Sequence, residues 1–85
     1  MELDTSLEAF LSVKESLPSI RDRMYEFVLV KGGATCDLLE FSLGLRHQTA
    51  SARITELLAM GLIRDSGLRD ETRSGRKAVI WEVVI

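Results

Sequence analysis

Residues 35–63 read TCDLLEFSLGLRHQTASARITELLAMGLI, and this stretch decides the fold. Thr35 is a favourable N-cap for a short helix, and Gly44 is a suitable residue to end it, since glycine accepts the left-handed conformation found after helices. A second, longer helix is expected over residues 47–60, with Gly61 as its terminator. The stretch therefore predicts two helices joined by a tight Gly-Leu turn.

The two sides of the longer helix differ in character. The predicted buried residues are Leu38, Leu39, Leu43 and Leu45 around the first helix and Ala50, Ile54, Leu57 and Leu58 on the second. The outward residues of the second helix are small or polar and uncharged, namely Gln48, Thr49, Ser51, Ala52 and Thr55. Glutamine can form two hydrogen bonds with adenine, serine and threonine can form a hydrogen bond with any base, and an alanine methyl can contact the methyl group of thymine. This face suits the major groove of DNA, and an ordinary solvated helix face is the alternative.

Two further helices are predicted upstream. The first covers residues 5–16, and the second begins near Pro18, because proline is disfavoured inside a helix but suits its first turn. Ser16 is the expected cap of the second helix, which ends at Gly32, while one bent helix over residues 5–31 is the alternative. Their apolar stripes consist of Leu3, Leu7, Phe10, Leu11 and Leu17, and of Ile20, Met24, Phe27 and Val28.

The periodicity changes after Gly61. Residues 62–64 and 78–85 are short runs rich in β-formers, separated by a polar stretch over residues 65–77 that contains Gly67. We expect two strands joined by a basic loop, whose cationic residues are Arg69, Arg73, Arg76 and Lys77.

The order of helix, helix, outward-facing helix and hairpin over residues 21–85 resembles the winged-helix subclass of helix-turn-helix DNA-binding domains. The resemblance is carried by T-A-S-A-R-I-x-x-L-x-x-M-G-L-I at residues 49–63. Residues 44–53 and 72–78 are similar to small winged-helix proteins of bacteriophages and bacteria. The resemblance implies a mainly α fold with a small β-hairpin (α+β).

One domain is expected over residues 1–85. It would comprise an additional N-terminal helix at 1–17, a helical core at 18–61 and a wing at 62–85. The sequence departs from the family at Glu40 and Phe41, where many helix-turn-helix proteins place alanine. A carboxylate between the two helices would cost free energy unless it faced solvent, so the angle between them is left open.

Charge is distributed unevenly along the chain. The net charge is −2, yet residues 46–77 carry seven basic and four acidic side chains, while residues 1–45 carry four basic and eight acidic ones. Phosphates are held by cations, so the basic half is the expected binding half. Arg46 and His47 lie at the start of the outward-facing helix, where a phosphate is commonly bound.

The resemblance implies that the wing residues Arg69, Arg73, Arg76 and Lys77 bind phosphates or the minor groove. A loop that is kept soluble by its charge is the alternative.

Several classes of function are excluded by composition. The chain has one cysteine, Cys36, which is expected to be a small packing residue, and one histidine, His47. Its carboxylates are not clustered in the sequence, so no metal, cofactor, small-molecule ligand or catalytic site is expected. No stretch of about 18 apolar residues could span a membrane, and the acidic N-terminus Met-Glu-Leu-Asp is unlike a secretory signal. A cytoplasmic protein without enzymatic activity is predicted.

The expected function is sequence-specific binding of double-stranded DNA, as a small phage or prokaryotic transcriptional regulator. The alternative is a winged helix used as a protein interaction module, which the acidic total charge favours. The apolar stripe of residues 1–17 has two interpretations, packing within one molecule or a homodimer interface.

Overall fold

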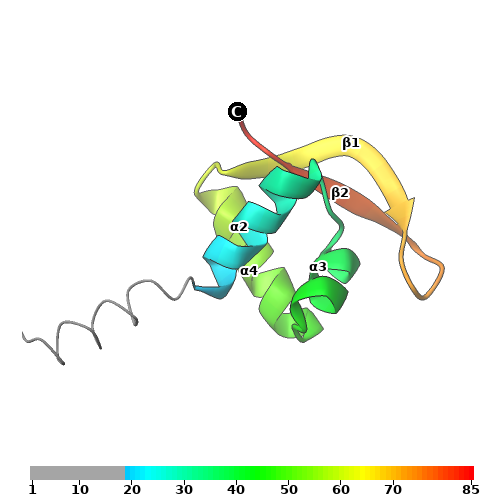
Figure 1. Ribbon diagram of the computed structural model, residues 1–85. Coiled ribbons are helices and arrows are strands. Elements are labelled where there is room, and N and C mark those ends of the chain that lie inside the picture. The colour runs from blue at the N-terminus through cyan, green and yellow to red at the C-terminus, as the bar shows by residue number, and fades with distance from the viewer. Residues whose placement is uncertain (1–18) are drawn as a thin grey trace, which may run out of the picture.

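A computed structural model describes residues 19–85, which form three helices followed by a two-stranded antiparallel sheet (Figure 1). In chain order the elements are α2 (Ile20–Lys31), α3 (Cys36–Leu43), α4 (His47–Ala59), β1 (Ile63–Glu71) and β2 (Lys77–Val83). This is the predicted α+β fold with winged-helix-like topology. The helix expected at residues 5–16 lies outside the described residues.

Helix α2 begins two residues later than predicted, at Ile20, and uses a different cap. The Ser19 hydroxyl, rather than that of Ser16, accepts a hydrogen bond from the Asp22 amide at 3.1 Å. Ser19 has an extended backbone, so α2 does not continue through it, and the single helix over residues 5–31 is wrong. At the other end, Gly32 is left-handed and its amide donates to the Val28 carbonyl at 2.9 Å, as predicted for a glycine terminator.

Helices α3 and α4 follow the predicted pattern closely. Thr35 caps α3 by accepting the Leu38 amide at 3.0 Å, and Gly44 ends it in the left-handed conformation. The buried residues of α4 are Ala50, Ile54 and Leu57. Leu58 was expected among them but is 38% exposed, because it lies a further 100° or so around the helix from Leu57 and beyond the covered stripe.

The hairpin strands are longer than the sequence indicates. Their register runs from Ile63 opposite Val83 to Glu71 opposite Lys77, with an irregularity between Asp65 and Arg69. The predicted loop over residues 65–77 is therefore wrong, and the connection is only residues 72–76. Most of β1 is exposed, so its polar side chains gave no alternating pattern, although its backbone is paired with β2.

One core joins the helices to the sheet. The largest completely buried side chains, Met24, Leu39, Leu57 and Val28, come from all three helices, and Ile63 and Val83 add the two strands. Ala34 exchanges two backbone hydrogen bonds with Trp81, at 3.0 and 2.9 Å, which fastens the α2 to α3 connection to β2. Of the described helices, none has both the length and the apolar character needed to cross a membrane.

Candidate nucleic-acid interface

The outward face of α4 is formed as the sequence predicts. Four of the five expected side chains are exposed, and Thr49 is partly buried; the four are Gln48, Ser51, Ala52 and Thr55. The Thr55 hydroxyl donates to the Ser51 carbonyl at 3.0 Å, so its hydrogen is engaged and its lone pairs are available. The face therefore offers small, uncharged groups on the side of α4 opposite the core.

The first turn of α4 is open to solvent. Arg46 is its N-cap and makes no side-chain capping bond, and the turn contains no acidic residue. The backbone amides at this end have no partner within the helix, and the helix dipole favours an anion there. The His47 side chain is 73% exposed, and its Nδ1 lies 2.8 Å from Glu40 Oε2.

Glu40 lies in the seam between α3 and α4, with its side chain only 14% exposed. Besides His47, the Cys36 thiol donates to Oε2 at 3.4 Å, and Arg73 Nη2 lies 3.8 Å from Oε1. The carboxylate is thus tolerated because polar and cationic groups surround it, not because it faces solvent. The seam holds a polar cluster where many helix-turn-helix proteins pack an alanine.

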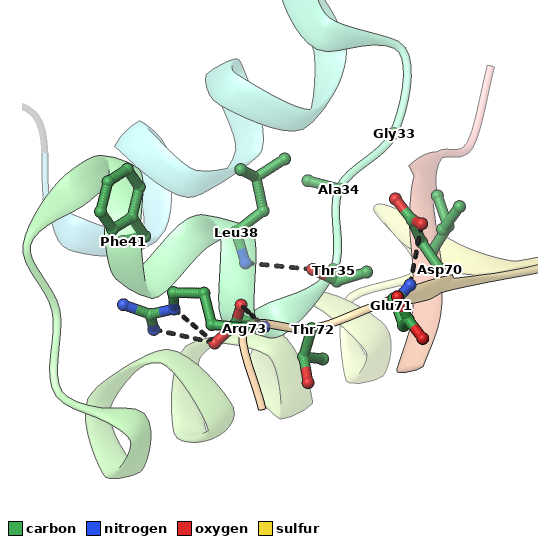
Figure 2. A pocket seen from close by; sticks show the side chains of 11 residues that line it. Gly33, Ala34, Thr35, Leu38, Phe41, Asp70, Glu71, Thr72 and Arg73 are labelled. Carbon is green, nitrogen blue, oxygen red and sulfur yellow. Dashed lines mark hydrogen bonds and ion pairs between the residues drawn. The ribbon is translucent and has the colours of Figure 1, made fainter. Parts of the chain in front are cut away.

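Arg73 ties the tip of the hairpin to α3. Its Nε donates to Asp37 Oδ1 at 2.9 Å, and its backbone amide donates to Asp37 Oδ2 at 3.0 Å. The guanidinium carbon is 5.3 Å from the centre of the Phe41 ring, and Figure 2 shows this side chain lying along α3. These bonds to Arg73 hold the pKa of Asp37 below its ordinary value. Arg73 therefore braces the wing against α3, while its side chain stays 56% exposed.

Fewer cations of residues 46–77 are free to bind phosphates than the composition of this half of the sequence indicates. Four of its seven cations have carboxylate partners at 2.7 to 3.0 Å, namely Arg53 with Glu56, Arg64 with Glu82, Arg69 with Asp65 and Arg73 with Asp37. Within residues 19–85, no ion pair is formed by the other three, Arg46, Arg76 and Lys77.

Two of these cations line the same hollow as the first residue of α4. Arg76 and Lys77 line a hollow of about 270 Å³ together with His47, and the other lining residues are Cys36, Asp37, Thr72, Ser74 and Ala78. The hollow therefore joins the hairpin tip to the first turns of α3 and α4. Side chains that the sequence separates widely are thus brought to one side of the molecule.

A second, larger hollow of about 460 Å³ lies between α3 and the hairpin, and sequence reasoning did not predict it (Figure 2). Its apolar wall includes Leu38, Phe41 and Ile80, and Asp70 and Glu71 lie along it. These two carboxylates thus border a different hollow from Arg76 and Lys77, although Glu71 is opposite Lys77 in the strand register.

Cys36 is half-buried at the start of α3. Burial, followed by the hydrogen bond to the Glu40 carboxylate, raises the pKa of the Cys36 thiol to about 12. The thiol is therefore protonated at neutral pH and is a poor nucleophile.

No model of a known protein family matches this chain, and a comparison with curated proteins finds no significant match.

Proposed function

We propose that the protein binds double-stranded DNA in a sequence-specific manner, as a small phage or prokaryotic transcriptional regulator acting without catalysis. The observation that carries the proposal is the exposed, uncharged face of α4, which adjoins the unpaired cations Arg46, Arg76 and Lys77 within the described residues. Helix α4 would enter the major groove, and the hairpin tip would contact phosphates beside it.

The two groups of side chains have different roles in this proposal. Gln48, Ser51, Ala52 and Thr55 read base edges, with Thr55 acting as an acceptor because its hydrogen is engaged by Ser51. Arg46, Arg76 and Lys77 position the protein on the phosphates, with His47 at the same hollow. Arg69 and Arg73 support the wing through their carboxylate partners, in place of the direct phosphate contact expected from the sequence.

The decisive experiment is selection from a library of random-sequence DNA duplexes. A sequence-specific reader enriches one family of sites over successive rounds, whereas a protein without this function leaves the library unchanged. Absence of enrichment at low salt, where phosphate contacts are strongest, would contradict the proposal.

Replacing Gln48 by alanine is expected to cost about 1 to 3 kcal/mol at one base position of the selected site, since a bidentate contact to a base is lost. Binding to unrelated duplexes should be nearly unchanged. The measurement is the affinity of parent and variant for the selected site and for its single-base substitutions. Ser42→Ala, at an exposed position of α3, serves as the control. An identical substitution profile for Gln48→Ala and parent would remove Gln48 from the set of reading residues.

The double variant Arg76→Ala/Lys77→Ala should weaken binding to all duplexes alike. Each lost phosphate contact lowers the slope of log affinity against log salt by about 0.9. Arg64→Ala is the matched control, because Arg64 Nε is bonded to Glu82 Oε2 at 2.7 Å and is not expected to contact DNA. If the salt slope of the double variant equals that of the Arg64→Ala control, the hairpin tip does not bind phosphates.

A second candidate function is a protein interaction module. It is favoured by apolar side chains on the exposed side of α2, where Val30 is 80% exposed and lines a shallow hollow with Phe27 and Leu43. The homodimer interface expected at residues 1–17 lies outside the described residues and stays a prediction. A library selection without enrichment would make this α2 surface the leading candidate.

A further inference from the structure

Three side chains of types that bind transition metals converge at the seam of α3 and α4. Cys36 and Glu40 lie one turn apart on α3, and His47 is the first residue of α4. One ligand atom from each lies within 4.8 Å of the other two. The expectation that no metal site exists was based on carboxylates scattered along the sequence. The fold brings one of them between the single cysteine and the single histidine of the chain.

Two of the distances among these atoms can be compared with the edges of a tetrahedral zinc site, and the third, between Cys36 Sγ and His47 Nδ1, is at most 4.8 Å. Cys36 Sγ lies 3.4 Å from Glu40 Oε2, and His47 Nδ1 lies 2.8 Å from the same oxygen. Zinc bond lengths of about 2.3 Å to sulfur and about 2.0 to 2.2 Å to nitrogen and oxygen give tetrahedral edges of about 3.6 and 3.4 Å. Small shifts of the side chains, His47 above all, would open the cluster enough for the ion.

The carboxylate of Glu40 divides its two oxygens between different neighbours. Oε2 faces the thiol and the imidazole, while Oε1 faces Arg73 Nη2 at 3.8 Å. Asp37, the nearest other acidic residue on α3, is held by Arg73 through both of its oxygens. An ion at Oε2 would therefore leave the brace between the hairpin and α3 intact.

We propose that Cys36 Sγ, Glu40 Oε2 and His47 Nδ1 form a binding site for a divalent transition metal ion, Zn²⁺ by preference. The mixture of sulfur, nitrogen and oxygen donors suits zinc and disfavours Mg²⁺ and Ca²⁺, which prefer all-oxygen sites. On binding, the Cys36 S–H bond breaks, its electron pair forms the metal bond, and the proton is released to solvent. Glu40 and His47 donate lone pairs.

The exposure of His47 gives the ion a path from solvent and leaves a fourth position for water. A bound ion would link α3 directly to the first turn of α4, replacing two hydrogen bonds with three coordinate bonds. This inference concerns metal binding alone and does not depend on the proposed DNA function.

The test is titration of the full, tag-free chain with Co²⁺, followed by displacement with Zn²⁺. We expect one ion per chain, a thiolate-to-cobalt charge-transfer absorption, loss of that absorption when Zn²⁺ is added, and a higher melting temperature with Zn²⁺. Because the chain has one cysteine, the charge-transfer absorption identifies Cys36 as a ligand without any variant.

Cys36→Ser, Glu40→Gln and His47→Gln should each weaken Co²⁺ binding by more than about tenfold, since loss of an outer-shell partner alone costs about 10 to 100-fold. Asp70→Asn, which removes an exposed carboxylate outside the cluster, should bind like the parent. Circular dichroism verifies that each variant is folded. A parent chain without the charge-transfer absorption, or a folded His47→Gln variant with parental affinity, would overturn the proposal.

Discussion

Replacing Ser51 by glutamate is expected to abolish binding to the selected DNA site. Ser51 lies in the middle of the exposed face of α4, between Gln48 and Thr55. A carboxylate at this position would be desolvated against base edges and would meet the negative potential of the phosphates without a cationic partner. The measurement is fluorescence anisotropy of a labelled duplex, with circular dichroism to verify that the variant is folded.

Val30→Glu is the matched control for this experiment. It adds the same charge at an 80% exposed position of another helix, on the side of α2 away from its buried residues Met24 and Val28. Because those residues pack in the core shared with α4, Val30 is not part of the α4 face that is proposed to enter the groove. DNA affinity should therefore change little in Val30→Glu. Folded Ser51→Glu that binds the site as tightly as Val30→Glu would show that α4 does not enter the groove.

Replacing Leu57 by alanine should lower the free energy of unfolding by about 2 to 5 kcal/mol, because a large buried side chain is lost and a cavity remains. Leu57 is completely buried and joins α4 to the core formed with α2, α3 and the strands. Total stabilities of small domains are only about 5 to 15 kcal/mol, so the loss is a large fraction. Urea unfolding followed by circular dichroism measures it.

Leu68→Ala makes the same chemical change at a position that is 64% exposed in β1. Its effect should stay within about 0.5 kcal/mol, as for most surface substitutions. Equal losses in the two variants would mean that Leu57 is not a core residue of the folded protein in solution.

Local signals in the sequence predicted most of the helix ends and which side of α4 is buried. Thr35 caps α3, and Gly32 and Gly44 end α2 and α3, because a cap or a left-handed glycine acts on backbone groups within a few residues of itself. The periodicity of α4 likewise predicted which side of it is buried and which set of residues faces outward. Leu58 was wrongly predicted to be buried, because periodicity does not give the width of the surface that neighbouring elements cover.

The length of the hairpin strands depended on pairing between distant segments. Residues 65–71 resemble a loop in composition, yet their backbone groups are paired with β2 over most of this range. A strand exposed on both sides has no hydrophobic alternation, so only the presence of its partner strand reveals it.

The candidate sites likewise depended on contacts between segments that are distant in the sequence. Counting charges predicted a basic half, but Asp37 comes from α3 to hold Arg73, and Glu82 comes from β2 to hold Arg64. The convergence of Cys36, Glu40 and His47 likewise depends on how closely α4 approaches α3. Ion pairing and coordination act over a few ångströms between side chains separated in the sequence, so tertiary structure decides them. Capping and periodicity act along one element, and the sequence alone determined what they control.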